Sequence, residues 1–228
     1  YLSVAIEKFC LRFSASLKIV GVSPWVNNHL KVNFKLKSKI RMLTIPINIE
    51  ESKTDFENEY DEFNRSKYLI YGARLVKEKG QMRLLEDIQR MNIDKPKINT
   101  IVFCGSGPLY EEINFFAKTK LTNYKIFILK NLDKKKYLNL VRKSSGFLFP
   151  SFREAFPLSL LESIFICKNV FIWEKYLYDF YSECSYEKKN LRNFLLKGYL
   201  KDLPNRKVVI DKLKLNYLRS DYFLNMIS

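Results

Sequence analysis

Two glutamates eight residues apart, Glu154 and Glu162, have surroundings that suit ligand chemistry. Glu154 precedes Pro157, and Glu162 follows about a turn and a half into the helix that Pro157 is expected to begin. Carboxylates accept hydrogen bonds from the vicinal hydroxyls of a sugar, and the free N–H groups of a helix N-terminus bind anions. The pair therefore suits a ligand with hydroxyls and a phosphate. The alternative for Glu162 is a solvent-facing helical glutamate.

A second candidate site is basic. Arg74 and Lys79 lie five residues apart in the segment GARLVKEKG, residues 72–80, which follows an apolar run and leads into a predicted helix. Two cations beside a helix N-terminus form an anion site because the helix dipole adds to their charge. An ordinary basic loop is the alternative in a chain with a net charge of +16.

A third turn is rich in glycine. Gly105 and Gly107 precede Pro108, which occupies the first position of a predicted helix. Glycines allow the backbone to approach a ligand closely, but they also serve any tight turn between a strand and a helix. The turn lacks the complete dinucleotide-binding pattern, so it indicates a ligand only together with the other two segments.

The elements that must position these residues alternate regularly along the chain. Near-continuous apolar runs predict strands that are covered on both faces, at residues 67–71, 100–104, 125–129, 146–150 and 169–173. The segments between them predict helices, at residues 81–92, 108–118, 134–143 and 157–166. This alternation predicts the α/β class, with a Rossmann-like doubly wound parallel sheet whose ligands bind beyond the carboxyl ends of the strands.

The flanking segments do not follow this alternation. Short strands are predicted at residues 17–22 and 39–46, with a helix from Ser23 to Leu30 between them and an acidic connector at residues 50–62. After residue 173 the sequence is rich in Tyr, Lys and Asn, and it predicts helices without strands.

Composition restricts the classes of partner and site. The excess of Lys and Arg favours an anionic partner, although solvated lysines would also account for it. The four cysteines are widely spaced, which favours reduced core thiols over disulfides or a zinc site. No apolar run reaches the ~18 residues of a membrane span, and no secretory signal is predicted. A single histidine, His29, excludes a Ser-His-Asp triad and His-based metal sites.

Three segments together resemble the group 1 (family 4) retaining glycosyltransferases. Residues 72–80 resemble the G-R-L-x-x-x-K-G segment, residues 103–109 resemble the G-x-G-P-L turn, and residues 144–162 resemble the P-S-x-x-E-x-F-P-L signature with its E-x7-E pair. The resemblance covers residues 17–175 and implies the GT-B fold. It implies that residues 1–50 are a remnant or the end of an N-terminal acceptor-side domain, with a linker. Residues 51–175 would form a nucleotide-sugar-binding Rossmann-like domain, and residues 176–228 a basic, aromatic-rich helical tail.

The resemblance also implies a reaction, namely transfer of a sugar from a nucleoside diphosphate with retention, in cell-surface polysaccharide or glycolipid synthesis. The catalytic candidates are Arg74 and Lys79 on the diphosphate and Glu154 on the donor sugar. Glu162 would accept from the ribose hydroxyls, and residues 128–132 would flank the base. The remaining donor-binding candidates are Gly72, Gly105, Gly107, Ala155, Phe156, Pro157 and Leu158. No Asp-x-Asp motif is present, so the resemblance implies no metal, and no cofactor besides the donor substrate.

The expected partners are a nucleotide-sugar donor, a saccharide or lipid-linked acceptor and an anionic membrane surface, with a cytoplasmic location. One alternative is a truncated or degenerate non-catalytic homologue, because only a remnant of the family's N-terminal domain is expected and CKNVFIWEK, residues 167–175, replaces a glycine-rich stretch. Lys130 also replaces a glycine that is common in the family. A nucleic-acid-binding module is a weaker alternative. Aromatic residues mingle with lysines in residues 176–222, but acids occur throughout and no binding motif is present.

Overall fold

The computed structural model describes residues 20–33, 41–42, 47, 67–203 and 206–217, and the structural statements below concern these residues. The chain divides into two compact units, which are described separately. The smaller unit comprises Tyr1–Asn48, Ala155–Pro157 and Leu213–Ser228, and the larger one comprises Ile49–Glu154 and Leu158–Lys212.

The larger unit is built on a six-stranded sheet with the order β5-β4-β3-β6-β7-β8, in which every pair is parallel. Its strands are β3 (Tyr68–Gly72), β4 (Thr100–Cys104), β5 (Lys125–Leu129), β6 (Gly146–Phe149), β7 (Val170–Ile172) and β8 (Tyr186–Glu187). This is the doubly wound order in which the chain starts at the centre, moves to one edge and returns to build the other half. The Rossmann-like fold class predicted from the sequence is confirmed.

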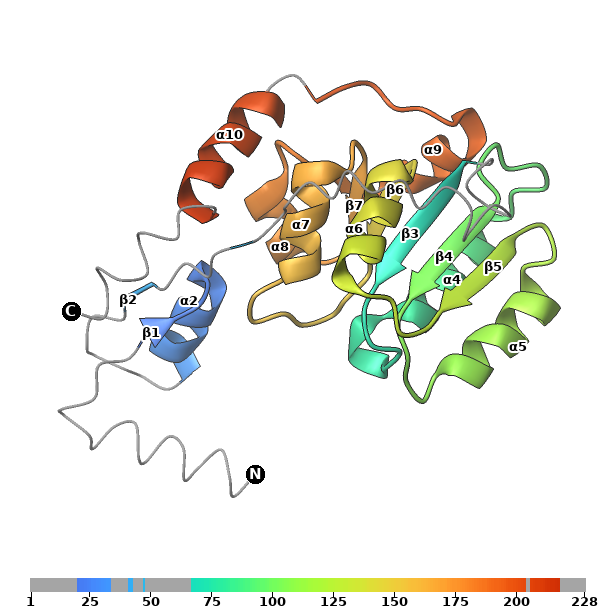
Figure 1. Ribbon diagram of the computed structural model, residues 1–228, viewed down its shortest axis with the longest axis horizontal. Coiled ribbons are helices and arrows are strands. Elements are labelled where there is room, and N and C mark those ends of the chain that lie inside the picture. Colours follow the sequence, from blue (N-terminus) through green and yellow to red (C-terminus); the bar gives the residue numbers. More distant parts are fainter. Residues whose placement is uncertain (1–19, 34–40, 43–46, 48–66, 204–205, 218–228) are drawn as a thin grey trace. The chain divides into compact units, whose positions relative to one another are not determined.

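Helices connect the strands and cover the sheet. They are α4 (Gln81–Met91), α5 (Tyr110–Lys120), α6 (Lys134–Lys143), α7 (Leu158–Ile166), α8 (Lys175–Tyr181), α9 (Leu191–Lys197) and α10 (Arg206–Tyr217), with short 3-10 turns η1 (Lys77–Lys79) and η2 (Lys188–Asn190). Figure 1 shows α6 and α7 next to each other in front of the sheet and α4 behind it. All four helices predicted between strands are present, with ends that differ from the prediction by at most two residues.

Aromatic side chains fill the core where the strand order reverses. Every residue of β3, β4, β6 and β7 is buried, as the near-continuous apolar runs predict. The ring of Tyr71 meets those of Phe103, Phe147 and Phe149 edge-on, with centroids 6.1–6.5 Å apart. Such edge-to-face contacts add to the stabilisation from burial and hold β3 between β4 and β6.

Two features of the sheet differ from the prediction. β5 is not covered on both faces: Lys125 is exposed and the rest of the strand is half-buried, because an edge strand has one neighbour only. The segment after residue 173 was expected to be helical without strands, but it contains β8, which pairs with β7. β8 has two residues, too few for an alternating pattern to be recognised. The ring of Tyr186 stacks on Phe171 at 5.7 Å, and this contact belongs to the tertiary structure.

The smaller unit contains β1 (Val20–Gly21) and β2 (Arg41–Met42), which pair in parallel, and α2 (Pro24–Asn33) lies between them in the sequence. The Ser23 hydroxyl accepts a hydrogen bond from the Val26 N–H group at 3.3 Å, as an N-cap residue does. Both short strands and the helix predicted here are present. The acidic connector predicted at residues 50–62 lies outside the described residues.

The cysteines agree with the prediction of reduced core thiols. Cys104, Cys167 and Cys184 are buried free thiols, whereas Cys10 lies outside the described residues. In the part of the chain that the structure describes, no helix combines the length and apolar character of a membrane span.

Candidate functional site

A cavity of about 380 Å³ opens at the carboxyl ends of β3 and β4. Four turns or helix starts contribute to it, and the predicted residues Gly72, Arg74, Gly105, Leu158 and Glu162 are among those that line it. The other lining residues are Cys104, Ser106, Asn131, Leu132, Lys134, Tyr137 and Ser159. Ligands of doubly wound sheets bind at this edge, so the cavity lies where the sequence predicts one.

Close backbone packing brings the turns after β3 and β4 together. Ala73 N–H donates to the Cys104 carbonyl at 3.0 Å, and Leu75 N–H donates to the Ser106 carbonyl at 2.8 Å. A Cβ atom at Gly105 would lie 2.0 Å from the Ala73 carbonyl oxygen, so no larger residue fits without moving backbone. A Cβ atom at Gly107 would likewise lie 2.4 Å from the Leu75 carbonyl oxygen, so both glycines have a packing role between the two turns.

Glu162 is the buried charge of this cavity. The residue is 5% exposed, which rules out the alternative of a solvent-facing glutamate. Its Oε1 atom accepts a hydrogen bond from the ammonium group of Lys134, the first residue of α6. A buried carboxylate without such a partner would be costly, so Lys134 compensates part of the cost of burying Glu162. Arg74, in contrast, is exposed at the cavity rim, and its side chain forms no ion pair within the described ranges.

Tyr137 lines the same cavity as Glu162. Its ring lies against β3, where a Cβ atom at Gly72 would be 2.3 Å from the Tyr137 Cε2 atom. Burial, followed by neighbouring negative charge that includes Glu162, raises the pKa of Tyr137 well above its usual value. The hydroxyl therefore stays protonated, yet it has no hydrogen-bond partner among the residues that the structure describes.

Glu154 and Lys79 form a second cluster beside β3 and β6, the neighbouring strands at which the order reverses. The Lys79 ammonium group donates to Glu154 Oε1 at 2.6 Å, and the Ser151 hydroxyl donates to the same oxygen at 2.6 Å. The side chain of Lys79 is 24% exposed, and that of Glu154 is 11% exposed. The Tyr71 hydroxyl donates to the Lys79 carbonyl at 2.9 Å, and burial, then the charge of Glu154, raises the Tyr71 pKa.

The structure therefore distributes the predicted site residues over two places. Arg74 and Glu162 line the cavity, whereas Lys79 and Glu154 contact each other, and no direct contact joins Arg74 to Lys79 within the described ranges. The remaining candidates lie in the loop between Glu154 and α7: Ala155 is exposed, Phe156 is half-buried and Pro157 is buried.

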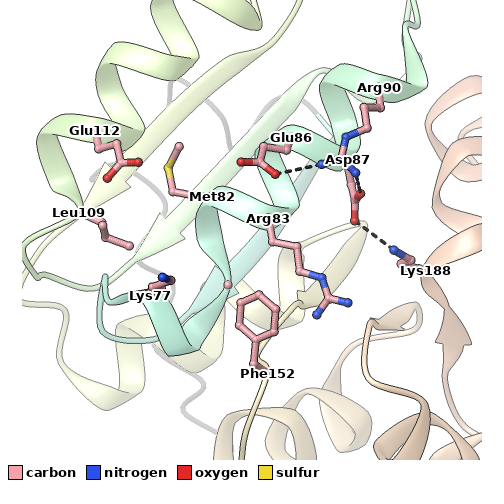
Figure 2. Close-up of a pocket in the computed structure, with 11 residues that line it drawn as sticks. Lys77, Met82, Arg83, Glu86, Asp87, Arg90, Leu109, Glu112, Phe152 and Lys188 are labelled. Atoms are coloured by element: carbon pink, nitrogen blue, oxygen red, sulfur yellow. Dashed lines mark hydrogen bonds and ion pairs between the residues drawn. The ribbon is translucent and has the colours of Figure 1, made fainter.

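A larger groove of about 660 Å³ runs along α4 (Figure 2). None of the predicted site residues lines it, and its wall includes Phe152, which lies between Ser151 and Glu154. Most of its cations are already paired: Arg83 with Glu174, and Arg90 and Lys188 with Asp87. This groove is therefore a separate feature of the surface.

Sequence reasoning assigned no role to Lys134, Tyr137 and Ser151. Lys134 and Tyr137 lie on one predicted helix, and their spacing matches the period of a helical face, which does not reveal that this face borders Glu162. Ser151 lies within the P-S-x-x-E segment, three residues before Glu154, and this spacing was the available signal. No group of three or more His, Cys, Asp or Glu residues that could hold a metal ion occurs in the described part of the chain.

Comparison with known families places the cavity in context. The sequence profile described as glycosyl transferases group 1 matches residues 52–181, more than half of the chain. The chain belongs to the group 1 glycosyl transferases. The matched region contains all the sequence segments of the cavity and of the Lys79–Glu154 cluster. No curated protein sequence matches the chain significantly.

Solved structures of glycosyltransferases share the fold. WaaG, a glycosyltransferase involved in lipopolysaccharide biosynthesis, matches 96% of this chain with 14% identity and a TM-score of 0.66. A glycosyltransferase from Rickettsia africae ESF-5 matches 98% of it with 19% identity and a TM-score of 0.59. The lipopolysaccharide outer core galactosyltransferase WaaB matches 91%, with 14% identity and a TM-score of 0.59. At these identities the likeness establishes the fold.

This group 1 glycosyl transferase chain spans only part of those proteins. It covers 63% of the WaaG chain, 57% of the Rickettsia africae chain and 59% of the WaaB chain. The GT-B fold expected from the sequence is supported by all three.

Proposed function

We propose that this chain is a retaining glycosyltransferase that binds a nucleoside-diphosphate sugar in the 380 Å³ cavity. The observation that carries the proposal is the combination, in one cavity of a group 1 chain, of an exposed arginine, a helix start and a buried carboxylate. Arg74 and the free N–H groups at the start of α7 attract a diphosphate, and Glu162 offers acceptors to ribose hydroxyls. Residues 128–132 flank the base, and no metal is required in this scheme.

Glu162 and Lys134 would exchange partners when the donor binds. The Lys134 ammonium group occupies Oε1 of Glu162, while a carboxylate has further lone pairs that can accept from hydroxyls. Lys134 is 55% exposed, so its side chain can turn toward a phosphate and still neutralise the site. The ion pair thus provides the buried Glu162 with a partner until ribose hydroxyls reach it.

The Lys79–Glu154 cluster would act on the sugar and the leaving group. As the bond between sugar and phosphate breaks, negative charge builds on the diphosphate, and Arg74 and Lys79 stabilise this charge. Glu154 accepts hydrogen bonds from the sugar hydroxyls and so orients the reacting carbon. The Ser151 hydroxyl, 2.6 Å from Glu154 Oε1, keeps the carboxylate in place when Lys79 turns toward the phosphate.

The acceptor is proposed to be a saccharide or a lipid-linked saccharide in cell-surface polysaccharide or glycolipid synthesis. WaaG and WaaB, which share the fold, are named for lipopolysaccharide. The net charge of +16 would favour a position at an anionic membrane surface on its cytoplasmic side. Sedimentation with vesicles of anionic lipid, compared with neutral lipid at the same salt concentration, tests this location; equal binding to both would contradict it.

Calorimetry with UDP, GDP and their sugar conjugates tests the donor site. We expect saturable binding of one base series, weakened about tenfold or more by Arg74→Ala or Lys79→Ala, because a hydrogen bond to a charged group contributes about 1.5–3 kcal/mol. Lys77→Ala is the matched control, since Lys77 is an exposed cation of the same turn that lines the other groove. Absence of binding to every nucleotide would favour a non-catalytic homologue that keeps the donor-binding fold.

A further inference from the structure

The segment Ser151–Glu154 after β6 is attached to the turn before α4 by backbone contacts. Phe152 N–H donates to the Glu78 carbonyl at 2.9 Å, and the Ser151 hydroxyl contacts the same oxygen at 3.3 Å. The bond from Phe152 holds the start of the segment, because the single proton of the Ser151 hydroxyl is donated to Glu154. Glu154 follows this anchored part of the segment, and its Oε1 atom accepts hydrogen bonds from Lys79 and Ser151.

The turn between β7 and α8 holds the same segment from a second direction. The Arg83 guanidinium group of α4 lies over the face of the Phe152 ring, 4.6 Å from its centroid, and it donates to Glu174 Oε1 at 2.5 Å. Figure 2 shows Arg83 next to Phe152. Glu174 is the residue directly before α8. A guanidinium group is attracted both by the face of an aromatic ring and by a carboxylate. Arg83 therefore links α4 to the segment Ser151–Glu154 and to the β7–α8 turn.

Tyr176, in the first turn of α8, reaches Glu154 itself. Glu154 N–H donates a hydrogen bond to the Tyr176 hydroxyl oxygen at 3.2 Å. This bond acts on the Glu154 backbone, so it is separate from the contacts that Lys79 and Ser151 make with the carboxylate. Tyr176 directly follows the segment 167–175, in which the sequence departs from the pattern of the glycosyltransferases.

We propose that Tyr176 is a positioning residue for Glu154, which fixes the backbone of the sugar-binding glutamate when Lys79 leaves it for the diphosphate of the donor. The proposal rests on the proposed function. An ammonium group that pairs with a phosphate no longer holds Glu154 Oε1 as firmly, because the two anions share its charge. The backbone bond to Tyr176 is unaffected by this exchange. It keeps the glutamate oriented in the state in which the sugar is bound, which is when orientation matters for reaction.

Tyr176→Phe removes the acceptor and keeps the ring, and Tyr178→Phe is the matched control. Tyr178 belongs to the same helix, and its hydroxyl forms no hydrogen bond with the part of the chain that the structure describes. Hydrogen–deuterium exchange measured by mass spectrometry on the unliganded chain should be about threefold to tenfold faster at the Glu154 amide in Tyr176→Phe, and unchanged in Tyr178→Phe.

Calorimetry then separates positioning from general stability. In the chain without substitutions, the nucleotide sugar should bind more tightly than the corresponding nucleoside diphosphate. Tyr176→Phe should lower this ratio about threefold to tenfold while the diphosphate affinity stays unchanged, because only the sugar contacts depend on Glu154. Tyr178→Phe should change neither affinity.

The outcomes distinguish the two proposals. If nucleotides bind but Tyr176→Phe leaves the ratio unchanged, or weakens both ligands equally, Tyr176 does not position Glu154, and the donor site stands. Unchanged exchange at the Glu154 amide would overturn the positioning role in the same way. If the unsubstituted chain binds no nucleotide, the proposed function fails, and the role of Glu154 on a donor sugar fails with it.

Discussion

At the scale of single residues, the polar groups of the cavity wall differ in whether they have partners. Glu162 is 5% exposed and is paired with Lys134, whereas the buried Tyr137 hydroxyl has no partner among the described residues. A paired buried group costs little, and an unpaired one costs its lost hydration. Removing the cation that pairs with Glu162 should therefore lower the stability of the fold, whereas removing the Tyr137 hydroxyl should not lower it.

Lys134→Met should destabilise the fold by about 1 kcal/mol, because it leaves the Glu162 carboxylate buried without its cation while the exposure of Lys134 screens the pair. Lys135→Met is the control: Lys135 is the exposed neighbour, and its loss should change the free energy of unfolding by less than about 0.5 kcal/mol. Urea denaturation of both variants measures the difference. Equal midpoints would show that the ion pair adds no stability.

Tyr137→Phe should leave the free energy of unfolding unchanged or raise it by up to about 1 kcal/mol, since it removes a buried hydroxyl that lacks a partner. Tyr68→Phe is the contrasting variant. The Tyr68 hydroxyl donates to the Leu140 carbonyl at 2.7 Å in a buried position, so its loss should cost about 1–2 kcal/mol. Thermal or urea unfolding tests both, and a large loss in Tyr137→Phe would reveal a partner for that hydroxyl.

At the scale of elements, the start of α4 depends on the glycine that joins it to η1. Gly80 has φ 72°, in the left-handed region, and a Cβ atom there would lie 2.3 Å from the Pro150 carbonyl oxygen. The close approach brings the turn with Lys79 against the end of β6, where the segment with Glu154 begins. The geometry of the Lys79–Glu154 pair thus depends on the absence of a side chain at residue 80.

Gly80→Ala should destabilise the fold by about 2–4 kcal/mol, from left-handed strain together with the displacement of backbone at Pro150. Gly198→Ala separates the two causes. Gly198 also has a left-handed φ, 76°, but a Cβ atom added there would be 3.6 Å from the nearest atom. Backbone strain alone should therefore make Gly198→Ala cost about 1–2 kcal/mol. Equal losses in the two variants, measured by urea denaturation, would contradict a close-packing role for Gly80.

At the scale of the whole molecule, buried acidic groups should make the fold sensitive to alkaline pH. Burial raises the pKa of Cys104 to about 12 and that of Tyr124 to about 12, and it raises that of Cys184 to about 11. In the unfolded chain these groups ionise near 9 for cysteine and 10 for tyrosine. Above pH 9 the unfolded state therefore releases protons that the folded state keeps.

Stability should fall as the pH rises from about 9 toward 12, by up to about 1.4 kcal/mol per pH unit for each such group. Urea midpoints measured between pH 8 and pH 11 test the slope. Cys104→Ala is the informative variant, because it removes one titrating thiol. The decrease in stability per pH unit should be smaller in this variant by the contribution of that thiol. A pH-independent midpoint over this range would contradict the burial of these groups in the folded state.

The amino-acid sequence by itself determined the alternation of strands and helices and the order of the three turns at one edge of the sheet. Apolar runs, glycines and helix starts are local features, and a parallel sheet brings all carboxyl ends of its strands to one edge, so the location of the cavity follows from them. The prediction failed where an element depended on a neighbour. β8 became a strand because β7 offered an unpaired edge, and β5 stayed half-buried because it has one neighbour only.

Tertiary structure alone decided which charges pair. Lys134 meets Glu162 across 28 residues of sequence, and Lys79 meets Glu154 across 75, whereas Arg74, only five residues from Lys79, lines a different part of the site. Sequence spacing predicts contacts within a helix or a turn, but ion pairs between elements depend on the order of the strands and the rotation of each helix. The sequence thus supplied candidate residues for the chemistry, together with the spacing of Ser151 and Glu154. The contacts of Lys134 and Tyr176 emerged only from the packing of α6 and α8.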